Sequence, residues 1–313
     1  MFLGIDGGGS KTTAVLFRAD GTFVDKAVVG SINYYSNPLS ATQDNLRAIV
    51  QAFRKYTDHF DAVCIGMSAL NDRANKAETE TFTGGILCAE HILMDSDLFI
   101  ALEAMHTNNP CAVAICGTGS MAVLRDTQGA VTHRGGFGYL LGDEGSGYAI
   151  SLEAIRTAIR AAEGIVPPTA LTEAALRYFE VSDVYGLIEK FYDPPMPRQA
   201  VAAFLPQVQR CAEAGDETAQ RVLRTQAEAF AATVLALVKE DLPVGLWGGV
   251  FCHVPQFAET FCDVLQKADR TQAHLLDFPP EIGAVFAAWK MCGIVPDAAR
   301  LARIRETYGV KEE

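Results

Sequence analysis

The same pattern, an apolar strand followed by a glycine-rich turn and a second apolar strand, occurs twice in this chain. The first copy contains GIDGGGSKT at residues 4–12, and the second contains CGTGS at residues 116–120. In both copies a Gly-X-Gly-Ser sequence forms the turn, at residues 7–10 and 117–120, so that the two turns match at a constant offset. An internal repeat of this length indicates two copies of one structural unit.

The sequence around these turns excludes the two best-known phosphate-binding loops. A P-loop requires a lysine directly after its last glycine, where Ser10 stands, and the dinucleotide pattern GxGxxG fails at Thr12. The second turn, GTGSMA, satisfies GxGxxA in form. In both of these known loops, however, a helix follows the glycines. Here alternating β-branched residues follow each turn and predict a hairpin and a third strand.

Segments with helical and strand periodicity alternate through the remaining sequence, which is typical of an α/β fold. Residues 193–197, DPPMP, interrupt two helices and are expected to form a loop. We expect helices at 40–58, 74–88, 97–107, 143–163, 169–179, 183–192, 198–214, 216–240, 254–268 and 281–292, and strands at 61–67, 91–95, 244–249 and 273–278.

The charge composition of the chain argues against some classes of binding partner. The 313 residues carry 26 basic and 38 acidic side chains, for a formal net charge of −12. This acidic excess disfavours nucleic acids and anionic membranes, because their phosphates need basic patches. The sequence shows no signal-peptide pattern and no apolar run of the ~18 residues that a membrane span needs. We therefore expect a cytoplasmic protein without a nucleic-acid or membrane partner.

Metal-binding spacings are missing from the sequence as well. The eight cysteines include no CxxC pair, and the six histidines include no HxxxH or HExxH pair. Scattered cysteines in such a chain are expected to be reduced and mostly buried.

Six motifs carry a resemblance to a known family. They are GIDGGGSKT (4–12), SIN (31–33), DSDLFIALEA (95–104), CGTGS (116–120), GGFGYLLGDEGSG (135–147) and LWGGVF (246–251). In this order and spacing they resemble the BadF/BadG/BcrA/BcrD ATPase family, which includes N-acetylglucosamine kinase, within the superfamily of actin, sugar-kinase and heat-shock-chaperone ATPases. The resemblance implies an α/β fold of duplicated ribonuclease H-like (actin-like ATPase) domains with a nucleotide cleft between them.

The repeat and the resemblance together suggest two domains. We expect an N-terminal domain of residues 1–112, with the C-terminal segment 294–313 as a candidate addition to it. The second domain is expected to span residues 113–293. The first would carry the catalytic base and the first phosphate turn, and the second would carry the other phosphate turn and the adenosine site.

The first turn offers a site for ATP and Mg²⁺. Asp6 ends the first strand, where one carboxylate could hold hydrated Mg²⁺ through water; the alternative is an aspartate that only stabilises the turn. Lys11 could bind phosphate or be a solvated hairpin residue. Backbone N–H groups of a glycine-rich turn can bind an anion. The predicted ATP contacts here are Asp6, Gly8, Gly9, Ser10, Lys11 and Thr12.

The second turn would hold the β- and γ-phosphates, and the resemblance singles out Thr118 for ATP. An ordinary tight turn is the alternative. Glycines after the strand at 244–247 would let the flat adenine approach the backbone, although they could simply start a helix. The resemblance also implies a nucleotide contact from Ala212. The predicted ATP contacts in this half are Gly117, Thr118, Gly119, Ser120, Ala212, Gly248 and Gly249.

Asp97 is the candidate general base. It lies where a strand meets a helix, so that its side chain points into the crevice beyond the strand end. A base there could accept the proton of a sugar hydroxyl as the γ-phosphate is transferred. Asp95 is the rival, and the family pattern of the following Ala-Leu pair favours Asp97. A plain helix N-cap is the alternative function for Asp97.

Sugar contacts are expected from two loops. Asn33 has an amide that can both donate to and accept from sugar hydroxyls, or it can be an ordinary loop residue. The resemblance implies sugar contacts from Gly136, Phe137, Gly138 and Asp143. Phe137 stands where the family often has tryptophan, so it keeps a stacking face and loses the N–H donor. Asp143 could alternatively only cap the helix expected at 143–163.

These features together predict ATP-dependent phosphorylation of the 6-hydroxyl of an amino sugar, first N-acetylglucosamine and next glucosamine. ATP and Mg²⁺ are the implied cofactors, the sugar and ATP are the small-molecule partners, and a homodimer is a candidate assembly.

Two other functions stay open from the sequence. One is an ATPase activator of a 2-hydroxyacyl-CoA dehydratase or benzoyl-CoA reductase, which would hold an iron–sulfur cluster on cysteines; only Cys111 and Cys116 are close together. The other is a non-catalytic sugar sensor.

Overall fold

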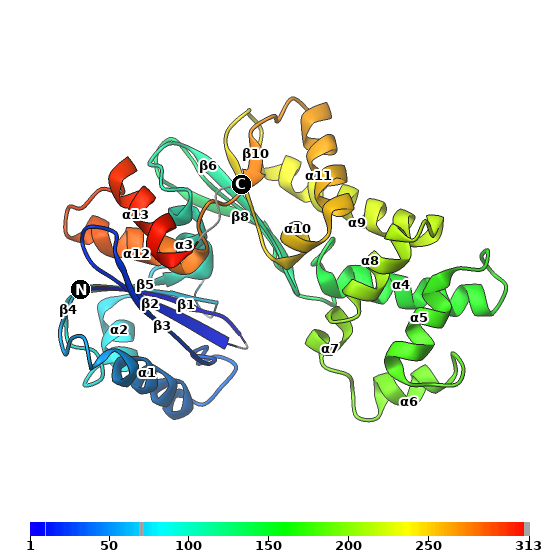
Figure 1. Cartoon of the computed structure of the whole chain (residues 1–313), viewed down its shortest axis with the longest axis horizontal. Coiled ribbons are helices and arrows are strands. Elements are labelled where there is room, and N and C mark those ends of the chain that lie inside the picture. Colours follow the sequence, from blue (N-terminus) through cyan, green and yellow to red (C-terminus); the bar gives the residue numbers. More distant parts are fainter. Residues whose placement is uncertain (10, 69, 71, 310–313) are drawn as a thin grey trace. The chain divides into compact units, whose positions relative to one another are not determined.

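The computed structural model describes residues 1–9, 11–68, 70 and 72–309. Its internal contacts divide the chain into two compact units, coloured along the sequence in Figure 1. Unit 1 contains Met1–Asn108 and Leu276–Glu313, and unit 2 contains Asn109–Leu275.

The sheet of unit 1 has five strands in the order β3-β2-β1-β4-β5. β1 is antiparallel to β2 and parallel to β4. The glycine turn therefore joins two antiparallel strands, which confirms the predicted hairpin and its third strand. The strands are β1 (Phe2–Gly7), β2 (Lys11–Phe17), β3 (Phe23–Gly30), β4 (Phe60–Met67) and β5 (Ala89–Ser96).

The sheet of unit 2 repeats this topology. Its order is β8-β7-β6-β9-β10, with β6 antiparallel to β7 and parallel to β9. β6 thus takes the place of β1, and the duplication predicted from the two turns is present in the strand order. The strands are β6 (Cys111–Cys116), β7 (Ser120–Arg125), β8 (Val131–Gly135), β9 (Val244–Trp247) and β10 (Ala273–Leu275).

Helices cover both faces of the unit 1 sheet, as Figure 1 shows. Side chains alternate across β1, so that Leu3 and Ile5 pack with α1 and α2, whereas Phe2 packs with the helices of the opposite face. The helices of the first face are α1 (Leu39–Phe53) and α2 (Lys76–Thr83), and those of the second are α3 (Asp97–Ala104), α12 (Pro280–Met291) and α13 (Ala298–Tyr308).

Unit 2 is mainly helical beyond its sheet. One hydrophobic core joins the strands to the helices, with Phe230, Phe251 and Phe261 in mutual ring contact. The helices are α4 (Gly147–Ala162), α5 (Ala170–Phe179), α6 (Gly186–Tyr192), α7 (Arg198–Ala202), α8 (Leu205–Glu213), α9 (Glu217–Leu237), α10 (Gly249–His253) and α11 (Pro255–Lys267).

Some predicted boundaries were wrong for local reasons. α4 begins at Gly147 and not at residue 143, because Asp143 and Gly145 have positive φ angles of 64° and 78°, which a helix does not allow. β9 ends at Trp247 because Gly248 has φ 109°. The helix predicted over 198–214 is two helices, α7 and α8.

The chain passes between the two units at other residues than the predicted domain boundaries. The chain leaves unit 1 after Asn108, not after residue 112, and returns at Leu276, not at residue 294. As a result α12, which the sequence placed in the second domain, packs on β1, β4 and α3 of unit 1. Glycine makes this possible, because a Cβ at Gly4 would lie 2.5 Å from the carbonyl oxygen of Glu281 in α12.

The part of the chain described by the structure contains no helix long and apolar enough to cross a bilayer.

The crossing of α12 and α3 gives a stability prediction. A Cβ at Gly283 would lie 1.9 Å from the carbonyl oxygen of Ile100, so Gly283→Ala must push the two helices apart. Helix propensity alone predicts a gain of about 1 kcal/mol for this change. We expect instead a loss of about 3 kcal/mol or more in the free energy of unfolding, measured by urea titration.

Ala287→Gly is the matched control in the same helix. It removes a buried methyl group and lowers helix propensity, so a loss of about 1–2 kcal/mol is expected. A Gly283→Ala protein that is more stable than wild type would contradict the close crossing.

Candidate active site

The first glycine turn is fixed to the loop that follows β3. The Ser31 hydroxyl donates to the carbonyl oxygen of Gly8 at 3.0 Å. The Thr12 hydroxyl oxygen, which is buried, accepts the N–H of Ile32 at 3.2 Å. The base of the turn is therefore held by hydrogen bonds from one neighbouring loop.

The tip of this turn is open to solvent. Gly9 and Lys11, both predicted to contact ATP, are exposed. Ser10, predicted to do the same, lies outside the described residues. The charge of Lys11 acts on Asp6 and lowers the pKa of that carboxyl, so the lysine is near the carboxylate and is more than a remote surface residue.

Asn33 is only 7% exposed, and its side chain is largely engaged inside unit 1. Its amide oxygen accepts the N–H groups of Tyr35 and Ser36 at 3.0 and 3.1 Å. Its amide nitrogen donates to the Ser68 hydroxyl at 3.1 Å. One amide N–H is left for a ligand, so Asn33 also shapes its own loop.

Asp6 lies near the end of β1, on the face covered by α3 and α12. Its pKa is raised to about 7, first because burial disfavours the charged form and then because Glu281 and Asp97 are also acidic. Lys11 and Lys26 oppose this rise. The structure thus brings the predicted magnesium residue and the predicted base within electrostatic reach of each other.

Glu281, near the start of α12, was not singled out from the sequence. It is 7% exposed, and its Oε1 accepts hydrogen bonds from Lys26 at 3.2 Å and from the Tyr308 hydroxyl at 2.9 Å. Burial and the glutamate raise the pKa of Tyr308. The signal in the sequence was a charged residue in the otherwise apolar segment PEIGAVFAAW, which a fully buried helix would not be expected to carry.

Asp97 is the first residue of α3, but it is not the N-cap. Ser96 takes that place, because its hydroxyl oxygen accepts the N–H of Phe99 at 3.2 Å. Burial raises the pKa of Asp97, while the N–H of Leu98 acts in the opposite direction. A carboxylate with a raised pKa at a strand end is suited to accept a proton.

Asp95, the rival base, is already paired. Its Oδ2 lies 3.3 Å from Nε of Arg73, and its Oδ1 accepts the Ser96 N–H at 2.7 Å. Asp97, by contrast, has no ion pair among the residues that the structure covers. Burial raises the pKa of both carboxyl groups, so the two differ in their ion pairing and not in the direction of that shift.

The surroundings of Asp6 fit a hydrated magnesium ion. Within the described ranges, no three His, Cys, Asp or Glu side chains are arranged to hold a metal. Mg²⁺ is commonly bound by one or two carboxylates, several waters and substrate phosphates. The pKa of Asp6 is raised although Lys11 and Lys26 act against the rise, so their charges compensate the carboxylate only in part, and a divalent cation would supply the rest.

In unit 2, the second glycine turn is tied to the segment that precedes α4. The Ser120 hydroxyl donates to the carbonyl oxygen of Glu144 at 2.7 Å. The N–H of Gly147 donates to the carbonyl of Gly117 at 2.8 Å, and the N–H of Gly136 donates to that of Ser120 at 3.2 Å. The hydroxyl group of Ser120, a predicted ATP contact, thus donates its hydrogen bond within the protein and positions the turn.

Asp143 joins the second turn to the glycine loop predicted to bind sugar. The backbone N–H groups of Ser120 and Gly138 act on its carboxyl and lower its pKa, and a Cβ at Gly119 would lie 2.8 Å from its Oδ2. It is 4% exposed, and burial raises its pKa. The alternative of a helix cap is wrong, because Ser146 caps α4 through its hydroxyl.

The glycine loop itself leaves an aromatic ring in solvent. Phe137 is 73% exposed, although phenylalanine is usually buried. Gly136 and Gly138 on either side have φ angles of 75° and 80°, which residues with a Cβ rarely adopt. The ring is thus available for stacking, as predicted for a sugar contact. Thr118 in the neighbouring turn is partly exposed.

Gly248 brings the end of β9 against the second turn. A Cβ there would lie 2.3 Å from the carbonyl oxygen of Cys116, the last residue of β6. Gly249 then begins α10. The predicted adenosine glycines and the predicted phosphate turn therefore adjoin each other within unit 2.

Ala212 gains no support from the structure as an ATP contact. It lies in α8, is 3% exposed and belongs to the hydrophobic core of unit 2. Its carbonyl oxygen accepts hydrogen bonds from Gln220 and Gly215, both at 3.0 Å. Its contact with the nucleotide stays a prediction.

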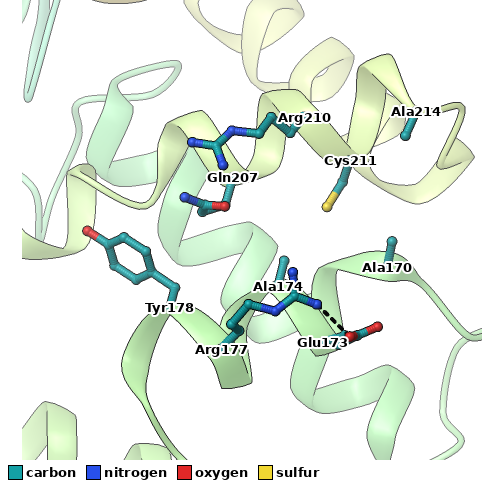
Figure 2. A pocket seen from close by; sticks show the side chains of 9 residues that line it. All are labelled: Ala170, Glu173, Ala174, Arg177, Tyr178, Gln207, Arg210, Cys211 and Ala214. Atoms are coloured by element: carbon teal, nitrogen blue, oxygen red, sulfur yellow. Dashed lines mark hydrogen bonds and ion pairs between the residues drawn. The ribbon is translucent and has the colours of Figure 1, made fainter.

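A separate pocket of about 430 Å³ lies between α5 and α8 and is drawn in Figure 2. Arg177 and Tyr178 line it from α5, and Arg210 lines it from α8; Arg177 pairs with Glu173 at 2.5 Å. The pocket contains none of the predicted site residues, so it is not the site described above.

The two cysteines that are closest in sequence are poorly suited to bind an iron–sulfur cluster. Both Cys111 and Cys116 are buried in β6. The Cys116 thiol donates to the carbonyl oxygen of Gly145 at 3.1 Å, and burial raises its pKa well above the ordinary value. Iron–sulfur ligation requires thiolates, which these surroundings disfavour.

Comparison with known proteins identifies the family. The model of the BadF/BadG/BcrA/BcrD ATPase family matches residues 3–288. The chain belongs to this family. It is 26% identical to the N-acetyl-D-glucosamine kinase of Dictyostelium discoideum, over 77% of this chain and 80% of that protein. It is 28% identical to the glucosamine kinase of Vibrio cholerae, over 75% and 80% respectively.

A solved structure shows the same fold. The structure of a candidate N-acetylglucosamine kinase from Chromobacterium violaceum matches with a TM-score of 0.74 and 24% identity, over 91% of this chain and 97% of that one. Together with the repeated strand order, this likeness confirms the predicted α/β fold of duplicated ribonuclease H-like, actin-like ATPase units.

The raised pKa of Asp6 gives a pH-dependent prediction. Its folded-state pKa of about 7 exceeds the ordinary 3.8, so the folded protein loses stability as pH rises from 4 to 7. Asp6→Asn removes this penalty. In magnesium-free buffer at pH 8 we expect the variant to be more stable than wild type by at most about 4 kcal/mol, with little difference at pH 4. Thermal unfolding across this pH range measures the difference.

Asp44→Asn is the control, because Asp44 is an exposed carboxylate that pairs with Arg47 on α1. It should leave stability nearly unchanged, by about 0.5 kcal/mol or less. An Asp6→Asn variant that is less stable than wild type at pH 8 would show that the Asp6 charge is compensated in the folded protein.

Proposed function

We propose that the protein transfers the γ-phosphoryl group of ATP to the 6-hydroxyl of an amino sugar, with N-acetylglucosamine first and glucosamine next. The observation that carries the proposal is the contrast between Asp97 and Asp95. Asp97 stands at the start of α3 without an ion pair among the described residues, whereas Asp95 is held by Arg73. The kinase relatives and the family match support the same reaction.

Proton transfer is the task of Asp97. Its raised pKa makes the carboxylate a better proton acceptor than an ordinary aspartate. It takes the proton of the sugar hydroxyl as the hydroxyl oxygen bonds to the γ-phosphorus and the bond from that phosphorus to ADP breaks. Phosphoryl transfer needs little covalent chemistry beyond this, so positioning and charge supply the rest.

Positioning comes from the two glycine turns and the loops tied to them. We assign the phosphates of ATP to the backbone N–H groups of the turns, with Lys11 and Thr118 at their exposed sides. Ser120 and Asp143 act through the turn that they hold and not as direct phosphate ligands. Asn33, Phe137 and Asp143 are assigned to the sugar, which stays a prediction for each.

Asp6 would hold magnesium through water. When bound, the ion supplies positive charge to the phosphates and to the acidic group of Asp6, Asp97 and Glu281. The proposal also includes location and assembly. We propose that the protein is cytoplasmic, forms a homodimer and has no nucleic-acid or membrane partner.

The other two functions lose support. An activator would need thiolate ligands for its cluster, and Cys116 is a buried thiol that donates a hydrogen bond. A sensor without turnover would not need an unpaired carboxylate in the place of Asp97. The amino-sugar kinase therefore accounts for more of the site than either alternative.

Replacing the two rival carboxylates tests the proposal. ADP release is followed with Mg-ATP and N-acetylglucosamine for wild type, Asp97→Asn and Asp95→Asn. We expect Asp97→Asn to lower the sugar-dependent rate by about 10²–10⁴-fold, because it cannot accept the proton. Asp95→Asn keeps an acceptor for the Ser96 N–H and should lose less than about tenfold.

The pH profile adds a second readout. Because the pKa of Asp97 is raised, kcat/KM should fall on acidification at a pH above the ordinary 3.8 of an aspartate. An Asp97→Asn protein that keeps its sugar-dependent rate while Asp95→Asn loses it would reverse the assignment. ATP hydrolysis that ignores added sugar would contradict the kinase itself.

A further inference from the structure

A pocket of about 420 Å³ lies in unit 1 between the loop that precedes α1 and helix α2. This volume is within the range of roughly 300–1,000 Å³ found for small-molecule sites. The pocket is lined chiefly by Tyr34, Tyr35, Leu39, Asn75, Glu78 and Phe82.

Aromatic rings form one wall of this pocket. The ring centroids of Tyr34 and Tyr35 are 5.2 Å apart, and those of Tyr34 and Phe82 are 5.5 Å apart. Tyr35 is 74% exposed, so its ring is accessible to a ligand. Such a wall suits a sugar ring, because the C–H groups on one sugar face pack against an aromatic face.

The wall is positioned by Asn33, the residue assigned to the phosphorylated sugar. The Asn33 amide oxygen accepts the N–H of Tyr35, and its carbonyl oxygen accepts the amide of Asn37 at 3.0 Å. Tyr34 and Tyr35 follow Asn33 directly in the same turn. The hydrogen bond from Tyr35 to the Asn33 side chain therefore ties the aromatic wall to the residue assigned to the sugar.

The opposite edge of the pocket is polar and acidic. Asn75 and Glu78 form a capping box at the start of α2, in which the Glu78 carboxylate accepts the Asn75 N–H at 2.8 Å. The lining residues include this one carboxylate and no lysine, arginine or histidine. Across the described chain, the phenol oxygens of Tyr34 and Tyr35 have no hydrogen-bond partner, so they are available to hydroxyl groups.

We propose that this pocket binds a second saccharide ring attached to the amino sugar, and that this ring is neutral or carries an amine. The inference rests on the proposed function, since it deepens the specificity of the same sugar site. An acetyl group would fill only a small part of the volume, whereas a hexose ring matches the aromatic wall and the polar edge. An acidic substituent is disfavoured because Glu78 would repel it.

Binding of sugars without ATP tests the inference directly. Titration calorimetry compares N-acetylglucosamine with the β-linked disaccharide of two N-acetylglucosamine units and with N-acetylmuramate. For wild type we expect the disaccharide to bind about tenfold more tightly than the monosaccharide, a gain typical of one aromatic contact surface. N-acetylmuramate should bind no more tightly than N-acetylglucosamine.

Tyr35→Ala should remove the advantage of the disaccharide and change monosaccharide affinity by less than about twofold. Tyr56→Ala is the matched control, because Tyr56 is another exposed tyrosine of unit 1 that does not line the pocket. It should change neither affinity. Glu78→Gln, which keeps an acceptor for Asn75, should weaken only a disaccharide whose second ring carries an amine.

Equal affinity of wild type for the monosaccharide and the disaccharide would overturn the inference, as would a preference for N-acetylmuramate. If N-acetylglucosamine is phosphorylated while either result is found, the inference fails and the proposed function stands. If no sugar binds and ADP release is independent of sugar, the proposed function fails and the inference fails with it.

Discussion

The carboxylate of Asp6, near the end of β1 and within electrostatic reach of Asp97 and Glu281, is the constraint on which unit 1 depends. Desolvation and like charge raise its pKa to about 7 against the effect of Lys11 and Lys26, so the ionised carboxylate is disfavoured in the folded protein. Gly4 and Gly283 have no side chains, and this lets α12 pack closely enough on β1 and α3 to carry Glu281 to the same place. In the proposed site a bound cation would relieve this repulsion.

In unit 2, the main constraint is that a short glycine turn is held in one conformation. Hydrogen bonds from Ser120, Gly147 and Gly136 fix the turn, and Asp143 bridges it to the loop that carries Phe137. A side chain at Gly248 would collide with the carbonyl of Cys116. Because these contacts connect the predicted phosphate, adenosine and sugar elements within one unit, a change at Asp143 is expected to disturb all three.

Sequence reasoning recovered the elements that depend on local pattern. The two glycine turns and the hairpins follow from strand alternation and from motif spacing, and the strand order agrees with them. The choice of Asp97 over Asp95 came from the family resemblance and stays a prediction. The packing of α12 on unit 1 and the burial of Glu281 could not be read in this way. Both result from contacts between segments far apart in the sequence, such as Lys290 with Glu103, 187 residues away, and Lys26 with Glu281, 255 residues away. Periodicity carries no information about such partners.

The most direct test of the account is the identity of the product. The protein is incubated with Mg-ATP and N-acetylglucosamine, and ³¹P NMR follows every phosphorus species with time. The account predicts that a sugar phosphomonoester and ADP form in equal amounts, with no inorganic phosphate beyond that of a protein-free control. Formation of ADP and inorganic phosphate without a sugar ester would contradict it.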